Sequence, residues 1–120
     1  MAILVTALRI DARGHITEVL ALSSVWDYRW YKLDGSYTAG TFPDKPILNL
    51  RMDARGHVRE VQVECGEPAE GSWYDLDGDW VEATGWPDSM LQNLRIDARG
   101  HIREVQMDDE IWYDLNGEAA

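Results

Sequence analysis

A twelve-residue motif, here called a phrase, occurs in three near-identical copies in the sequence, and this repetition constrains the fold more than any other feature. Each copy contains Asp-Ala-Arg-Gly-His, and each is followed by a shorter phrase that runs from Trp to Gly. The copies of the two phrases begin at Leu8, Leu50 and Leu94 and at Trp30, Trp73 and Trp112. A tandem period of about 40 residues means that one supersecondary unit is used three times. We therefore predict one domain of three repeats, over residues 1–42, 43–86 and 87–120.

Length and charge limit the function. At 120 residues, the chain is the size of one domain with a modest core. It carries 22 acidic and 11 basic residues, a net charge of −11. Binding to bare nucleic acid needs clustered Lys and Arg, so this charge argues against it. It is compatible with a neutral ligand such as a sugar, or with a basic protein partner.

The sequence also gives expectations about compartment and membrane. Cys65 is the only cysteine, so no disulfide can form within the chain. The apolar run at residues 1–5 is too short for a signal-peptide core, and no stretch reaches the length of a membrane span. We expect a cytoplasmic protein, or one released without a visible signal peptide, with no membrane partner.

The first phrase predicts a β-hairpin. Apolar and polar residues alternate on both sides of the segment 53–57, with Leu50 and Met52 before it and Val61 and Val63 after it. Asp favours the start of a type I turn, and Gly can adopt the left-handed conformation that closes it. We predict three-residue hairpin loops, each with a glycine bulge. The bulge glycines are Gly14, Gly56 and Gly100.

The second phrase predicts another hairpin in each repeat. Asp-Gly or Asn-Gly between alternating residues is a strong hairpin signal, and Asp77-Gly78 is the clearest example. The segment 75–79 superficially resembles a calcium loop. However, Trp86 stands where the EF-hand pattern requires Glu, so we interpret the segment as a turn. The third repeat stops soon after Gly117, so its fourth strand is missing or very short.

The fold class is therefore all-β, with about four antiparallel strands in each repeat. We expect propeller-like blades, and because propellers usually need four to eight blades, a dimer would supply six. A β-trefoil is the alternative. An open stack of three units would leave sheet edges exposed.

The repeat resembles a blade of the fungal fucose-specific lectin family and of its small bacterial relatives. The similarity consists of Arg between two apolar residues, a turn that ends in Gly, then Ile-x-Glu, with Val58 in place of Ile in the second repeat, and then a Trp-rich hairpin. The matching residues are Arg9, Gly14, Glu18, Trp26 and Trp30 in the first repeat, Arg51, Gly56, Glu60 and Trp73 in the second, and Arg95, Gly100, Glu104 and Trp112 in the third. In that family Arg and Glu bind sugar hydroxyls, a Trp stacks on the sugar ring, and small bacterial members oligomerise into six-bladed rings.

The resemblance implies three sugar sites, and the chemistry of the residues agrees. Arg donates, Glu accepts, and an indole can cover an apolar sugar face or pack in the core. The candidate sugar-binding residues are Arg9, Glu18, Trp30, Arg51, Glu60, Trp73, Arg95, Glu104 and Trp112. A simple hairpin register places Arg51 opposite Arg59, which would separate Arg51 from Glu60, whereas a β-bulge would return them to one face. The alternative to a sugar-binding role is that Arg and Glu only form a cross-strand ion pair and bind no ligand.

A histidine follows each turn glycine, at His15, His57 and His101. Three imidazoles on a threefold axis could hold a metal. We expect instead exposed turn histidines, each paired with the neighbouring Asp, and therefore no metal and no cofactor.

No nucleophile elbow, phosphate loop or zinc-protease helix is present, so we predict no catalytic residues and no enzyme. The predicted function is multivalent carbohydrate binding by a homo-oligomer. The alternatives are an acidic module that binds a basic protein, such as an inhibitor or immunity factor, and a structural repeat within a larger particle.

Overall fold

The computed structural model describes residues 4–24, 27–64 and 70–120, and all regular structure in them is β-strand. The first sheet contains β1 (Leu4–Ile10), β2 (Ile16–Ser24), β3 (Asp27–Lys32) and β4 (Tyr37–Ala39). The second contains β5 (Ile47–Met52), β6 (Val58–Val63), β7 (Ser72–Asp75) and β8 (Trp80–Ala83). The third contains β9 (Leu91–Ile96), β10 (Ile102–Met107) and β11 (Trp112–Tyr113). The predicted all-β fold of repeated antiparallel units is confirmed.

The first hairpin of each repeat has the predicted turn. In the second repeat, the backbone N–H of Asp53 donates to the carbonyl of His57 at 3.0 Å, and that of Gly56 donates to the carbonyl of Asp53 at 3.1 Å. Gly56 has φ of 86°, in the left-handed region that favours glycine. The Asp53 side chain accepts the N–H groups of Arg55 and His57 at 2.8 and 3.0 Å, which locks the loop.

The outer hairpin of the second repeat uses the same chemistry. Asp75 Oδ1 accepts the backbone N–H groups of Asp77 and Asp79, and Gly78 has φ of 85°. The segment is therefore the predicted hairpin turn. In the third repeat β11 has only two residues, and a single bridge joins Tyr113 to Ala119 in place of a fourth strand.

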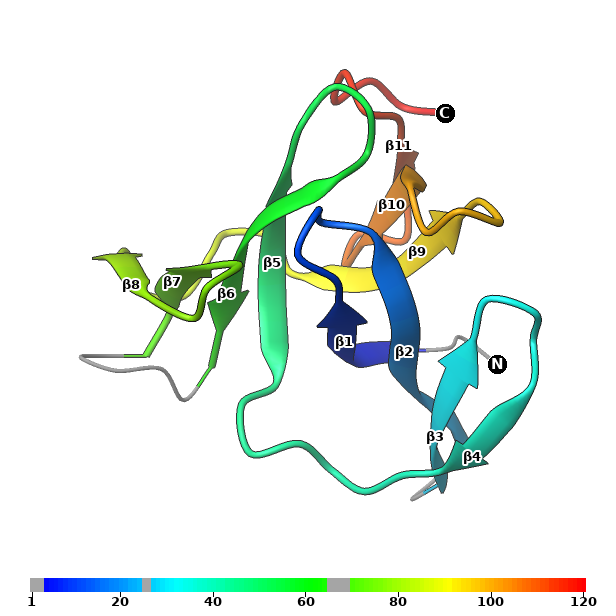
Figure 1. Cartoon of the computed structure of the whole chain (residues 1–120). Coiled ribbons are helices and arrows are strands. Elements are labelled where there is room, and N and C mark those ends of the chain that lie inside the picture. The colour runs from blue at the N-terminus through cyan, green and yellow to red at the C-terminus, as the bar shows by residue number, and fades with distance from the viewer. Residues whose placement is uncertain (1–3, 25–26, 65–69) are drawn as a thin grey trace.

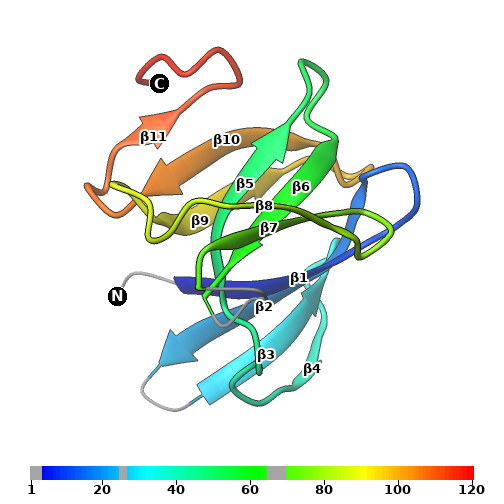
Figure 2. The same ribbon diagram turned by 90° about the vertical axis from the view of Figure 1, so that its left-hand side faces the viewer.

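The three sheets surround a common centre. The inner strands β1, β5 and β9 contact one another in pairs, and the sheets extend outward from them in three directions (Figure 1). Figure 2 looks onto the second sheet and shows the first and third sheets extending to either side of it. The equivalent side chains of Ile16, Val58 and Ile102 are fully buried at the centre of the core.

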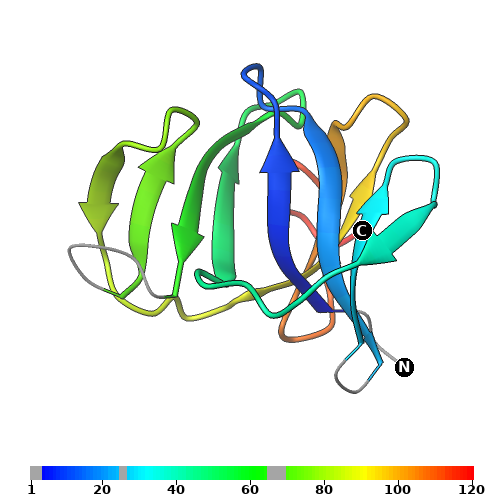
Figure 3. The ribbon, with the colours of Figure 1, turned by 60° about the horizontal axis from the view of Figure 1, so that its bottom comes forward.

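The turns of the three inner hairpins lie at one end of the molecule (Figure 3). There, three backbone hydrogen bonds form a closed cycle between the repeats. They are Val58 N–H to Gly14 O at 2.8 Å, Ile102 N–H to Gly56 O at 2.9 Å, and Ile16 N–H to Gly100 O at 2.9 Å. A Cβ on Gly56 would lie 2.1 Å from the Ile102 carbonyl oxygen, so this close approach requires glycine.

The sheets remain separate, because no strand pairing joins one sheet to another among the described strands. The arrangement is therefore three blade-like sheets and not the single closed barrel of a β-trefoil. The cycle of contacts closes within one chain, so a second copy is not needed to complete it. The described segments contain no helix with the length and hydropathy that crossing a membrane requires.

Candidate functional site

A β-bulge brings the repeated Arg and Glu together. In the second repeat the register shifts between Arg51 and Met52, so Arg51 pairs with Glu60 and Met52 pairs with Val58. The extra residue, Arg59, has no partner across the ladder, and its guanidinium instead binds the Asp53 carboxylate at 2.9 Å. The simple register is therefore wrong, and the bulge considered as its alternative is present.

The same ion pair forms in every repeat. Arg9 Nη1 lies 2.8 Å from Glu18 Oε1, Arg51 Nη1 lies 2.8 Å from Glu60 Oε1, and Arg95 Nη1 donates to Glu104 Oε1. The arginine side chains are 43–56% exposed. Each pair is therefore open to solvent and within reach of a ligand.

Each guanidinium also lies on an indole ring. The Cζ atom is 4.0 Å from the ring centroid in all three pairs, which are Arg9 on Trp30, Arg51 on Trp73 and Arg95 on Trp112. We call each set of Arg, Glu and Trp an Arg-Glu-Trp group. The cation covers one face of each ring. Trp73 is in addition only 5% exposed, while Trp30 and Trp112 are half-buried. Trp26 lies outside the described residues.

The group in the second repeat has an additional carboxylate. Glu82 on β8 forms a second ion pair with Arg51. The hydrogen bond to Glu60 and the bond and charge of Glu82 raise the pKa of Arg51 above its ordinary value, against the lowering effect of partial burial. Sequence reasoning missed Glu82, because the third repeat ends before an equivalent strand and no repeated motif marks the position.

The histidines meet at the turn end of the molecule. The distances between Nε2 atoms are 3.0 Å from His15 to His57, 3.0 Å from His57 to His101 and 3.1 Å from His101 to His15. Their side chains are 17–25% exposed. The expectation of exposed, separate turn histidines is therefore wrong, because the closed cycle of repeats brings the three turns together.

The predicted pairing of each histidine with its neighbouring Asp is present. The Nδ1 to Oδ2 distances are 3.4 Å for His15 and Asp11, 3.2 Å for His57 and Asp53, and 3.6 Å for His101 and Asp97. Desolvation acts to raise the pKa of Asp53. The backbone N–H groups of His57 and Arg55 and the Arg59 guanidinium outweigh it and lower that pKa to about 2.

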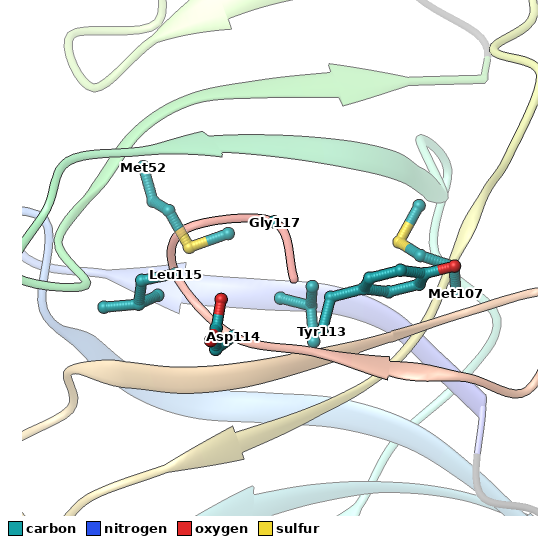
Figure 4. Close-up of a pocket in the computed structure, with 7 residues that line it drawn as sticks. Met52, Met107, Tyr113, Asp114, Leu115 and Gly117 are labelled. Atoms are coloured by element: carbon teal, nitrogen blue, oxygen red, sulfur yellow. The ribbon is translucent and has the colours of Figure 1, made fainter. Parts of the chain in front are cut away.

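A shallow pocket of about 430 Å³ lies elsewhere, between the second sheet and the C-terminal hairpin. Figure 4 shows Met52 pointing from β5 toward the segment of Asp114 to Gly117. Val105 and Tyr113 line this pocket, and they alternate with Glu104 and Trp112 along their strands. The pocket is therefore on the opposite face of the third sheet from the Arg-Glu-Trp group.

Comparisons with protein-family models, with curated proteins and with solved structures give no match. The similarity to lectin blades therefore rests on the repeated motif alone.

Proposed function

We propose that this protein is a non-enzymatic carbohydrate-binding protein with one shallow site in each repeat. The observation that supports the proposal is the assembly of the repeated Arg, Glu and Trp into the same exposed group three times. Each group offers the donors and acceptors that neighbouring sugar hydroxyls require.

The chemistry of recognition follows from the pairing. A guanidinium has five N–H donors in a fixed fork, so one ion pair with Glu leaves donors for a ligand. The carboxylate keeps lone pairs that accept from a hydroxyl. A vicinal diol can therefore bridge Arg and Glu, each oxygen donating to Glu or accepting from Arg.

The indole has a different role from the one that the resemblance implies. Because Arg covers one face of the ring, the proposal assigns to Trp the role of holding the guanidinium in place, not of stacking on the sugar. Trp73 is buried and contributes through packing. Trp30 and Trp112 are half-buried beside their groups. This arrangement favours sugars recognised mainly through hydroxyls.

Three weak sites gain strength from avidity. Linked sites that engage one multivalent surface bind by orders of magnitude more tightly than a single site. The proposed ligand is therefore a clustered glycan that can engage the three sites of one chain together.

A glycan array tests the proposal. The chain offers a matched control, because Arg29 pairs with Asp27 at 2.7 Å and lies 4.3 Å from the centroid of Tyr37, outside the repeated motif. Wild type and the Arg29→Ala variant are expected to bind the same glycans, and the Arg9→Ala/Arg51→Ala/Arg95→Ala variant is expected to lose them. Circular dichroism verifies that each variant is folded. Equal binding by the folded triple variant, or no binding by the wild type, would refute the proposal.

A second candidate is an acidic module that binds a basic protein. An apolar pocket of about 280 Å³ lies where β1, β5 and β9 begin, and its lining includes Phe42 and Trp86, which are 59% and 51% exposed. A partner with an apolar side chain inside a basic surface fits this pocket and the net charge of −11. A pull-down tests this candidate. A partner that is retained at low salt, released at high salt and lost with Trp86→Ala would favour it over sugar binding.

A further inference from the structure

The three histidines of the chain converge on one point, and they are all the histidines that it has. Their Nε2 atoms form a nearly equilateral triangle with sides of 3.0–3.1 Å. The three contacts join residues 42, 44 and 86 positions apart, so the arrangement depends on the closed cycle of repeats.

Hydrogen bonds alone cannot satisfy this triangle. A neutral imidazole nitrogen either carries a hydrogen and donates or has a lone pair and accepts. Around a triangle, at least two of the three nitrogens are of the same kind, so at least one contact joins two donors or two acceptors. A cation at the centre removes the conflict, because all three nitrogens can then direct lone pairs at it.

The neighbouring aspartates favour the arrangement in which each Nε2 atom carries a lone pair. Oδ2 of Asp11, Asp53 and Asp97 faces Nδ1 of its own histidine at 3.4, 3.2 and 3.6 Å. A carboxylate beside Nδ1 favours the tautomer with the proton on Nδ1, which leaves the lone pair on Nε2. Metal-binding histidines commonly donate their second ring N–H to a carboxylate, and here each carboxylate lies beside Nδ1 at ion-pair distance.

The surrounding backbone fixes the ligands in advance. Each histidine N–H donates to the Oδ1 atom of its own aspartate at 3.0 Å. The residue after each histidine makes one of the three hydrogen bonds of the cycle between the repeats. In two repeats an arginine also holds the aspartate, Arg59 on Asp53 at 2.9 Å and Arg103 on Asp97 at 3.1 Å.

We propose that His15, His57 and His101 bind one divalent transition-metal ion through their Nε2 atoms, with zinc as the reference ion. Three imidazoles with an additional open position suit zinc, cobalt or nickel, and they do not suit calcium or magnesium, which prefer oxygen ligands. Tetrahedral zinc with Zn–N bonds of about 2.0–2.1 Å would place the nitrogens about 3.3–3.4 Å apart. The rings would therefore move outward by only a few tenths of an ångström.

The consequence of binding is structural. The ion would tie together the three turns above the fully buried Ile16, Val58 and Ile102, and so would link the first repeat directly to the last. The metal site shares no residue with the Arg-Glu-Trp groups, so a failure of the metal proposal would not affect the sugar-binding proposal, and the reverse is also true.

Calorimetry and thermal unfolding of chelator-treated protein test the proposal. Zinc is expected to bind with a stoichiometry of one per chain and to raise Tm by at least about 5 °C at saturating concentration. Calcium is expected to leave Tm unchanged. The His57→Ala variant is expected to bind zinc at least tenfold more weakly. Asp114→Asn is a matched control, because Asp114 caps an equivalent turn that lacks a histidine, and its zinc affinity is expected to equal that of the wild type.

Nitrogen NMR of the wild type gives a readout that does not depend on a variant. Zinc is expected to shift the Nε2 resonances of all three histidines together, with saturation at one equivalent. The absence of binding by the wild type, unchanged affinity in folded His57→Ala, or Nε2 resonances that do not respond to zinc would each overturn the proposal. If His57→Ala does not fold, the NMR titration decides.

Discussion

The guanidinium carbon of Arg51 lies 4.0 Å from the centre of the Trp73 ring, and its Nη1 atom lies 2.8 Å from the Glu60 carboxylate. The indole and the carboxylate therefore fix the cation from two directions. The same relationship recurs in the first and third repeats, where the indoles are less buried.

Trp73 is expected to matter more for stability than for binding. Replacing this buried indole by alanine should lower the free energy of unfolding by about 3–4 kcal/mol, because it removes a large packed side chain. The half-buried Trp112 is the matched comparison, and Trp112→Ala should cost less than half as much. Urea denaturation measures both, and equal losses would contradict the difference in packing.

Glu82 is expected to weaken the group of the second repeat by competing with a ligand for Arg51. The Arg9→Ala/Arg95→Ala background leaves this group as the only complete one. In that background, Glu82→Gln should tighten glycan binding about threefold, since it removes one exposed ion pair. Titration calorimetry measures the change. Weaker binding after the substitution would show that Glu82 contacts the ligand.

Gly56 is expected to be essential for the association of the repeats. Gly56→Ala combines a left-handed backbone with a clash against the Ile102 carbonyl and should cost at least about 3 kcal/mol. Gly78 has nearly the same φ, 85°, but beyond its two chain neighbours no heavy atom lies within 4 Å of the position of a Cβ, so Gly78→Ala should cost about 1 kcal/mol. Chemical denaturation of the two variants separates the cost of the left-handed backbone from the cost of the clash with Ile102. Similar losses in the free energy of unfolding would argue against the close approach of Gly56 to Ile102.

Acid is expected to destabilise the fold through Asp53. Its pKa is lowered from 3.8 to about 2 in the folded state, so its stabilising contribution is complete above pH 3.8 and disappears as the pH falls toward 2. Asp53→Asn should therefore be less stable than the wild type at pH 5, and the difference should shrink toward pH 2. The free energy of unfolding measured across this range tests the expectation. A difference that stays constant with pH would contradict it.

The local structure could be predicted from the sequence. The Asp-x-x-Gly spacing specifies a three-residue loop with a left-handed glycine, and Gly14, Gly56 and Gly100 all have φ of 85–89°. The register could not be predicted with the same certainty. The bulge recurs at Thr17, Arg59 and Arg103, whose side chains make different contacts, and alternation of apolar residues does not show it.

The way in which the three repeats pack together could not be predicted from the sequence pattern. Three equivalent hairpins are compatible with blades, with a barrel or with an open stack, and packing between the sheets decides among them. The convergence of the histidines follows from that packing. The spacing Asp-x-x-x-His, at Asp53 and His57 for example, was the available signal, because the residue that caps the turn also faces the ring.

Stoichiometry of sugar binding tests the account most directly, because the account assigns one site to each Arg-Glu-Trp group. A glycan selected by the array is titrated as a monovalent ligand into the wild type, into the Arg95→Ala variant and into the Arg9→Ala/Arg95→Ala variant. The account predicts that the number of sites per chain falls by one with each substitution, while Arg29→Ala retains the wild-type number. A number of sites that does not change across this series would contradict it.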